Sequence, residues 1–159
     1  MSQIVGQQIA DCTLHIKDED GIDTLETGAF FADKKVVIFS VPGAFTPTCS
    51  VKHLPSYLAH YDALKQAGFD AILCLSVNDA HVMKEWGDHQ KVGDKIIMAA
   101  DMSTDFSQSL GLAVHMGPVL GTRAGRSAIV VEKGVITHAF IEEPAVYEVS
   151  SAEHVLANL

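Results

Sequence analysis

The sequence predicts an α/β domain built on a central mixed β-sheet flanked by helices. Short apolar runs rich in β-branched residues alternate with segments in which apolar residues recur every three or four positions, a pattern typical of parallel βαβ units. Two more apolar runs near the C-terminal end are joined by Lys133-Gly134, which predicts an antiparallel hairpin. With 159 residues, of which 48% are hydrophobic and 19% charged, we expect one domain over residues 1–159.

The first half of the chain begins with expected strands. Loose alternation of apolar residues between Ile9 and Lys17 predicts an early strand, followed by a turn at Asp18-Glu19-Asp20-Gly21. A loop is expected around Thr27-Gly28. The run from Val36 to Val41 is almost continuously apolar, which predicts a strand buried on both faces of the sheet.

A helix is expected after that strand. Thr46 is a suitable N-cap residue, and Pro47 is a suitable first helical residue because its missing N–H costs nothing there. Pro55 removes a backbone hydrogen bond within the helical pattern and predicts a bend. The helix is expected to end at Gly68. Its buried stripe is predicted from the apolar spacing and consists of Val51, Leu54, Leu58, Tyr61 and Leu64.

The later segments repeat the alternation. Residues 70–77 predict a second buried strand, and Asn78-Asp79 caps the helix that follows. Residues 96–100 predict a third strand, with Ser103 or Thr104 expected to cap the next helix.

The last part of the chain starts with a glycine-rich segment. Residues 111–125 lack a nucleotide-binding pattern and predict an irregular loop. Residues 127–132 and 135–141 form the expected hairpin, and Ser150 or Ser151 is expected to cap a final helix. Parallel βαβ units followed by an antiparallel pair are the layout of a thioredoxin-like fold, which is the fold we predict.

Charge and composition exclude several classes of function. The formal net charge of −9 argues against nucleic acid and anionic membranes as partners. No apolar run approaches the roughly 20 residues that span a bilayer, and the N-terminal residues lack the layout of a signal peptide, so a cytoplasmic location is expected. The eight histidines show no metal-ligand spacing, and neither a metal nor a cofactor is expected.

The three cysteines have different surroundings in the sequence. Their odd number and the absence of a Cys-x-x-Cys pair argue against a disulfide framework. Cys12 is expected to be a small half-buried residue, and Cys74 lies in a wholly apolar run that predicts an inert buried thiol. Cys49 falls near the third helical position, where unpaired N–H groups and the helix dipole favour the thiolate. The sequence therefore predicts Cys49 as the nucleophile.

A cation is needed beside such a thiolate. Arg126 directly precedes a strand whose start lies next to the Cys49 segment in a thioredoxin-like sheet, so we expect its guanidinium to stabilise the thiolate and to bind a substrate oxygen. Arg123 is expected at the surface. His53 follows Cys49 by four residues and could act as a general base. The alternative is a structural role, because the dipole and Arg126 already favour the thiolate.

The segment around Cys49 carries a family resemblance. Pro42-Gly43-Ala44-Phe45-Thr46-Pro47-Thr48-Cys49 resembles the Pro-x-x-x-Thr-x-x-Cys motif of the peroxiredoxins, in the form typical of the type II, peroxiredoxin-five-like subfamily. The resemblance extends from about Val36 to Ile141. It includes His53-Leu54-Pro55, Cys74-Leu75-Ser76-Val77-Asn78-Asp79 and Glu85-Trp86-Gly87.

The resemblance implies a role for each motif residue. Cys49 resembles the peroxidatic cysteine, which attacks a hydroperoxide and becomes a sulfenic acid. Thr46 resembles the residue whose hydroxyl accepts a hydrogen bond from the peroxide and donates one toward the sulfur. Pro42 resembles the proline that shields the sulfenate. Arg126 resembles the arginine that polarises the peroxide and holds the thiolate. The implied activity is reduction of hydrogen peroxide and alkyl hydroperoxides.

The source of the reducing thiol also follows from the resemblance. Some subfamily members carry a resolving cysteine near the C-terminus, whereas residues 147–152 here contain none. We therefore expect a one-Cys mechanism in which glutathione, with or without glutaredoxin, or thioredoxin supplies the second thiol. A disulfide from Cys49 to Cys12 or Cys74 requires Cα atoms within about 7 Å, which the sequence does not determine. A homodimer is implied as well.

Two other functions fit the same cysteine. A redox sensor or holdase would use the Cys49 sulfenate to signal to a protein partner and would turn over poorly with small thiols. A cysteine hydrolase would pair Cys49 with His53, but no Asn or Asp is evident to orient the imidazole.

Overall fold

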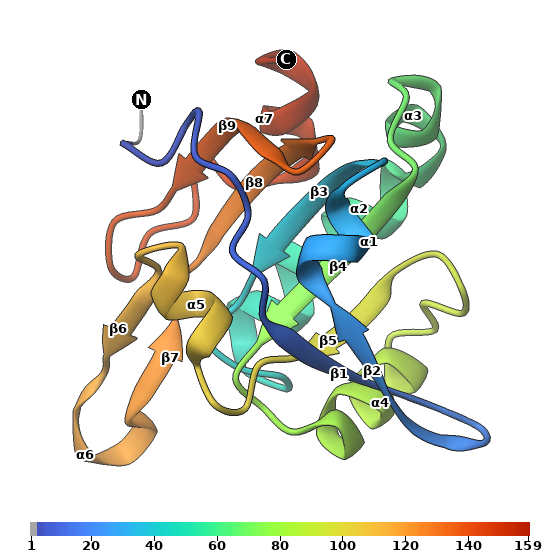
Figure 1. Ribbon diagram of the computed structural model, residues 1–159. Helices are drawn as coiled ribbons and strands as arrows, with labels where there is room; N and C mark the ends of the chain where they lie inside the picture. The colour runs from blue at the N-terminus through green and yellow to red at the C-terminus, as the bar shows by residue number, and fades with distance from the viewer. Residues whose placement is uncertain (1–2) are drawn as a thin grey trace.

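The computed structural model describes residues 3–159 and contains a seven-stranded mixed β-sheet (Figure 1). Its strand order is β2-β1-β5-β4-β3-β8-β9, with parallel pairing at β3-β4 and β4-β5 and antiparallel pairing elsewhere. This arrangement confirms the predicted fold class. Met1 and Ser2, included in the predicted single domain, lie outside the described residues. The strands are β1 (Thr13–Asp18), β2 (Gly21–Glu26), β3 (Lys35–Ser40), β4 (Ala71–Ser76), β5 (Ile97–Ala100), β8 (Ser127–Glu132) and β9 (Val135–Ile141).

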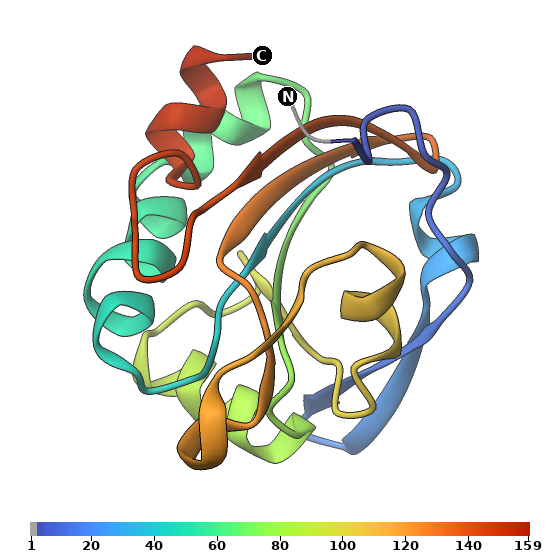
Figure 2. The ribbon, with the colours of Figure 1, turned by 90° about the vertical axis from the view of Figure 1, so that its left-hand side faces the viewer.

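Helices cover both faces of this sheet, as Figure 2 shows with the sheet seen nearly edge-on. One layer packs on the side that carries Cys49 and consists of η1 (Cys49–His53), α2 (Leu54–Ala59), α3 (Tyr61–Gln66), α4 (Ala80–His89) and α7 (Ala152–Ala157). The opposite layer consists of α1 (Thr27–Phe31) and α5 (Asp105–Ser109). The fold is therefore a three-layer α/β/α arrangement.

Strand β3 shows why both faces must be covered. Val37 and Phe39 belong to the core on the Cys49 side, whereas Val36 and Ile38 belong to the core on the other side. Because successive side chains of a strand alternate between the faces, the continuous apolar run supplies both cores. The strand predicted to be buried on both faces is confirmed.

Two predictions near the N-terminus need correction. The residues after the turn at Asp18–Gly21 form strand β2, which pairs antiparallel with β1 and was not predicted. The loop expected around Thr27-Gly28 is the beginning of α1. The Thr27 hydroxyl donates to the Ala10 carbonyl at 2.6 Å, and the Cys12 N–H donates to its oxygen at 2.7 Å. This buried residue ties α1 to a distant segment, so no local pattern marked the helix.

The helix after β3 is interrupted, as Pro55 predicted. Residues Cys49–His53 form a π-helical turn, in which the Leu54 N–H donates to the Cys49 carbonyl five residues earlier. A π-turn holds one more residue than an α-turn, so the buried stripe shifts along the chain. Val51, predicted to be buried, is 72% exposed, whereas His53 and Tyr57 are fully buried. The helical region ends near Gly68, as predicted, and the φ of 94° at Gly68 fits a residue that ends a helix.

The helix caps follow the sequence in two cases out of four. The Thr46 side chain, expected to cap the helix that carries Cys49, makes no capping bond. Asp79 accepts from the Val82 N–H, and Ser151 accepts from the His154 N–H. For α5 the cap is instead Asp101, a buried residue that accepts from two backbone N–H groups and one hydroxyl of the helix. The expected cap at Ser103 or Thr104 is wrong in this respect, because the Thr104 side chain makes no capping bond and Ser103 makes only a weak one to Asp105.

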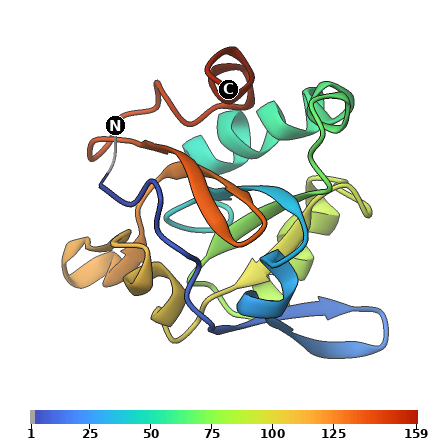
Figure 3. The same ribbon diagram turned by 45° about the horizontal axis from the view of Figure 1, so that its top comes forward.

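The glycine-rich segment is ordered rather than irregular. It contains β6 (Ala113–His115), the short helix α6 (Gly117–Leu120) and β7 (Thr122–Ala124), and β6 pairs antiparallel with β7. This small hairpin projects from one side of the main sheet, as Figures 1 and 3 show. Within residues 3–159, no helix has the length and apolar character needed to cross a bilayer.

Candidate active site

The sheet topology brings Arg126 and the Cys49 segment together. Strands β3 and β8 pair antiparallel with Ser40 opposite Ser127, and the hydroxyl oxygens of these two residues lie 2.7 Å apart. The end of β3 therefore meets the start of β8. Cys49 follows β3 through the segment 41–48, which we call the elbow, and Arg126 directly precedes β8. Residues 77 positions apart in the sequence become neighbours in this way.

Cys49 is buried and lies in contact with a guanidinium group. Its side chain has no exposed surface, and Arg126 Nη2 donates to Cys49 Sγ at 3.2 Å. A cation at this distance stabilises the thiolate form of the sulfur. Cys49 also begins the π-helical turn, near the N-terminal end of the helical segment that follows Pro47.

The Thr46 hydroxyl has a partner that was not expected. It donates to the Gly43 carbonyl at 2.7 Å and makes no capping bond to the helix. A hydroxyl has a single hydrogen, so in this state it does not donate toward Cys49 Sγ. Its two lone pairs stay available to accept a hydrogen bond from a hydroperoxide.

His53 is a neutral hydrogen-bonding partner of Arg126. Its Nδ1 accepts from Arg126 Nη1 at 3.0 Å, and its Nε2 donates to the Ser150 carbonyl at 3.0 Å. The pKa of His53 is lowered to about 3, mainly by burial and also by the Arg126 charge, while the Ser150 bond opposes the shift. Both ring nitrogens are occupied, so this arrangement leaves no base for Cys49 and argues against a cysteine hydrolase.

The segment 142–150 covers this pair from outside. The buried Tyr57 hydroxyl also donates to the Ser150 carbonyl at 2.8 Å, and burial raises the pKa of Tyr57, which keeps this hydroxyl protonated. Glu142 Oε2 accepts from the backbone N–H groups of residues 148–150 and from the Ser150 hydroxyl. The Tyr147 ring lies against the guanidinium group, with 5.9 Å between the ring centroid and Arg126 Cζ.

Two residues outside the motif bond to the elbow backbone. Asn78 Oδ1 accepts from the Ala44 N–H at 2.8 Å, and Arg123 Nη1 donates to the Pro42 carbonyl at 3.0 Å. The sequence predicts Asn78 as part of a helix cap and Arg123 at the surface, whereas in the structure Asn78 bonds to the elbow and Arg123 is half-buried. The position of Asn78 directly after a buried strand was a usable signal, because the ends of neighbouring parallel strands meet at one edge.

Comparison with known proteins identifies the family. A family model described as Redoxin matches residues 4–156. Peroxiredoxin-2D from Arabidopsis thaliana is 39% identical over 157 residues, which cover 98% of this chain and 97% of the relative. The chain belongs to the peroxiredoxin family.

Solved structures agree with this assignment. Reduced Prx3 from Vibrio vulnificus in complex with h2o2 is similar with a TM-score of 0.93 and 43% identity over 96% of both chains. Peroxiredoxin 5 from Alvinella pompejana is similar with a TM-score of 0.84 and 31% identity, covering 96% of this chain and 95% of that one. The predicted type II, peroxiredoxin-five-like resemblance is confirmed, and the chain is a thiol peroxidase.

The other two cysteines of this peroxiredoxin lie on different faces of the sheet. Cys12 packs against the core on the far face of the sheet, whereas Cys49 and Cys74 belong to the near core. Cys74 is fully buried in the central strand β4, and burial and the neighbouring Cys49 charge raise its thiol pKa well above the ordinary value. All three thiols are free.

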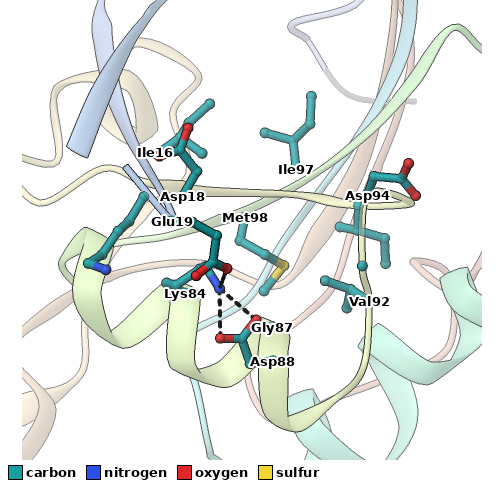
Figure 4. A pocket seen from close by; sticks show the side chains of 13 residues that line it. Ile16, Asp18, Glu19, Lys84, Gly87, Asp88, Val92, Asp94, Ile97 and Met98 are labelled. Carbon is teal, nitrogen blue, oxygen red and sulfur yellow. Dashed lines mark hydrogen bonds and ion pairs between the residues drawn. The ribbon is translucent and has the colours of Figure 1, made fainter. Parts of the chain in front are cut away.

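Two cavities differ in their position relative to the predicted site residues. One of about 330 Å³ has a mostly apolar lining and is bordered by Pro42, Arg126 and the segment 142–146. A larger one of about 470 Å³ lies between the β1-β2 turn, α4 and β5 (Figure 4). At its mouth Lys84 pairs with Glu19 at 3.0 Å and Asp88 at 2.7 Å, and none of its lining residues is a predicted site residue.

No metal centre accompanies the thiol in the part of the chain that is described. Within residues 3–159, no group of three or more His, Cys, Asp or Glu side chains could hold a metal ion.

Proposed function

We propose that this peroxiredoxin reduces hydrogen peroxide and alkyl hydroperoxides by a one-Cys mechanism at Cys49, with glutathione as the external reductant, with or without glutaredoxin. Thioredoxin is the alternative reductant. The observation that carries the proposal is the 3.2 Å contact of Arg126 Nη2 with Cys49 Sγ at the start of a helical segment. It is supported by the match of nearly the whole chain to a redoxin family model.

The first step transfers one oxygen atom to sulfur. The Cys49 thiolate attacks the nearer peroxide oxygen, a sulfur–oxygen bond forms, and the oxygen–oxygen bond breaks. Sulfur is oxidised by two electrons to a sulfenate, which becomes sulfenic acid when it takes up a proton from the solvent. The distal oxygen is reduced and leaves as water or an alcohol after it gains the proton of the hydroperoxide.

The neighbouring groups stabilise the charge that moves during this step. Arg126 lies where it can donate both to the sulfur and to the developing charge on the peroxide oxygens. Thr46 offers oxygen lone pairs to the hydroperoxide O–H, and the Cys49 N–H adds a donor. Pro42 shields the sulfenate from water. His53 Nδ1 accepts a hydrogen bond from Arg126 Nη1, and Arg126 Nη2 is directed at the sulfur.

The second stage regenerates the thiol from outside the protein. A glutathione thiolate attacks the sulfenate sulfur, water leaves, and a mixed disulfide forms; a second thiol then releases the Cys49 thiolate and a small disulfide. The burial of Cys74 within β4 and the location of Cys12 on the far face of the sheet support an external thiol.

A stopped-flow experiment tests the proposal. The single tryptophan, Trp86, bonds through Nε1 to Ser50 Oγ at 3.0 Å and so reports on the Cys49 helix. One equivalent of peroxide should change its fluorescence rapidly in the wild type but not in Cys49→Ser. Mass spectrometry after addition of glutathione should then show one glutathione on Cys49. Equal peroxide consumption by Cys49→Ser contradicts the assignment, and stable sulfenate without turnover supports the sensor function instead.

We also propose a homodimer. Large apolar side chains are exposed on the elbow, on η1 and on the β6-β7 hairpin, where Phe45 is 53%, Val51 72% and Val119 89% exposed. Such side chains near one site are typical of an interaction surface. Light scattering should give twice the chain mass for the wild type and a monomer for Val119→Asp; a monomeric wild type contradicts this proposal.

A further inference from the structure

Arg123 connects the β6-β7 hairpin to the elbow. Its Nε donates to the Leu120 carbonyl at 2.8 Å, and its Nη1 donates to the Pro42 carbonyl at 3.0 Å. One planar guanidinium group thus bonds a carbonyl on each segment. The first bond fixes the side chain on its own hairpin, and the second fixes the Pro42–Gly43 peptide of the elbow.

Gly43 has no side chain and so leaves room for this contact. A Cβ atom on Gly43 would lie 2.7 Å from Arg123 Nη1 and 3.3 Å from Thr46 Cγ2. The shorter distance is below any ordinary contact, so the guanidinium would have to leave its place against the elbow. The glycine therefore allows Arg123 to reach the Pro42 carbonyl.

The next peptide group, Gly43–Ala44, orients Thr46. The Gly43 carbonyl accepts from the Thr46 hydroxyl at 2.7 Å, which decides the direction of the hydroxyl hydrogen and leaves the lone pairs free. On the other side, Asn78 holds the Ala44 N–H at 2.8 Å. Between these anchors Phe45 adopts a φ of 62°, a left-handed conformation that a non-glycine residue adopts only when its surroundings enforce it.

We propose that Arg123 is a positioning residue for the peroxidase reaction, acting through Pro42 and Gly43 on the Thr46 hydroxyl. This inference rests on the proposed function of Cys49. Arg126 holds the sulfur, and Arg123 holds the backbone that presents the peroxide-binding hydroxyl. The two arginines of the segment Arg123-Ala124-Gly125-Arg126 thus act on different parts of one site.

Two variants break the contact from opposite sides. Arg123→Met removes the donors and keeps much of the side-chain length, whereas Gly43→Ala keeps Arg123 and displaces its guanidinium. Each should slow the oxidation of Cys49 by peroxide about 10-fold to 100-fold in single-turnover stopped flow, because a small misplacement of a group that binds the reacting atoms has effects of this order. The double variant should be no slower than the slower single variant, since both remove the same contact.

Further measurements separate positioning from general damage. Arg123→Lys should recover part of the rate, because an ammonium group can still donate to Pro42. The ultraviolet absorbance of the Cys49 thiolate should stay as in the wild type, since Arg126 is untouched. Lys17→Met, which removes a positive charge from β1, is the charge control and should react at the wild-type rate.

The outcomes distinguish this inference from the proposed function. If the wild type oxidises rapidly and Arg123→Met and Gly43→Ala do so equally, Arg123 has no positioning role. If the rate losses of the two variants multiply in the double variant, they act separately and the inference is overturned. If Arg123→Met does not fold, the oxidation rates of Gly43→Ala and Arg123→Lys are compared with that of the wild type instead. A wild type that does not react with peroxide overturns the proposed function itself.

Discussion

At the scale of single residues, Arg126 joins two groups of different chemistry, the sulfur of Cys49 and the neutral ring nitrogen of His53. Each of its two terminal nitrogens has a separate partner. Among residues 3–159 Arg126 forms no ion pair with a carboxylate, because the uncharged imidazole supplies an acceptor and leaves the positive charge available to the sulfur.

Loss of Arg126 should slow the chemical step. Arg126→Ala removes the donor to the sulfur and to the peroxide, and we expect the rate of Cys49 oxidation to fall by on the order of 10²-fold or more, which corresponds to about 3 kcal/mol. Arg126→Lys should retain some activity but lose the bidentate arrangement. Stopped flow with a range of peroxide concentrations measures the rate of Cys49 oxidation. An unchanged rate in Arg126→Ala would show that another residue supplies the cation.

The buried neutral His53 should make stability depend on pH. The pKa of His53 is about 3 in the folded state and about 6.5 in the unfolded state, so below pH 6.5 the unfolded chain binds a proton that the folded chain does not. Stability therefore falls as the pH decreases from about 6.5 to 3. Between pH 7 and pH 5 the loss from this group should be about 2 kcal/mol.

Urea unfolding of the wild type and of His53→Gln at both pH values measures this loss. Glutamine keeps one acceptor and one donor but does not titrate, so its stability should change less over the same interval. Equal losses in the two proteins would show that His53 does not contribute.

At the scale of elements, the helix that carries Cys49 is shaped by a missing hydrogen bond. Pro55 has no N–H. In a π-turn that N–H would donate to the Ser50 carbonyl, five residues earlier. The Ser50 carbonyl accepts instead from Gln90 Nε2 at 3.1 Å. Helix α4 thus supplies the donor that the proline lacks. The sequence predicted an interruption at Pro55, but the π-turn depends on this contact with a distant helix.

The cap of α5 gives a stability prediction for a single element. Asp101 is buried and accepts from the Phe106 N–H, the Ser107 N–H and the Ser107 hydroxyl. Asp101→Ala should lower the free energy of unfolding by about 2–3 kcal/mol, because it removes a cap and leaves buried donors unpaired. The matched control is Ser103→Ala at an exposed position, which should change it by less than about 0.5 kcal/mol. Chemical denaturation compares the two, and similar losses would contradict this assignment of the cap.

At the scale of the whole molecule, the sheet separates the cysteines. Cys49 and Cys74 lie in the core on one face, and Cys12 packs against the core on the other. A disulfide between Cys12 and Cys49 would have to pass through the sheet. Cys74 is held in β4 by pairing with both β3 and β5, so it has little freedom to approach another sulfur.

The double variant Cys12→Ser, Cys74→Ala should therefore keep its turnover. We expect a steady-state rate with peroxide and glutathione within about twofold of the wild type, because the second thiol comes from solution. Cys49→Ser is the inactive reference. A large loss of turnover in the double variant, with its rate of Cys49 oxidation preserved, would show that one of the two cysteines resolves the sulfenate.

Much of the architecture and the nucleophile followed from the sequence alone. The continuous apolar run at Val36–Val41, the hairpin around Lys133-Gly134 and the caps at Asp79 and Ser151 are local patterns, and local hydrogen bonding and burial determine them. The helix start after Pro47 and the motif around Cys49 are also contained in one short stretch. These features could be predicted because the interactions that create them join residues close together in the chain.

Only the tertiary structure decided the partners of that stretch. The pKa of His53 depends on its burial, on Arg126 and on the Ser150 carbonyl, the last two 73 and 97 positions away, and the bond from Arg123 to Pro42 spans 81 positions. No periodicity or cap marks such pairs, because they meet through the pairing of β3 with β8 and the folding of the hairpin beside the elbow. The sequence predicted Cys49 as the residue that reacts, whereas the fold decided which residues contact it.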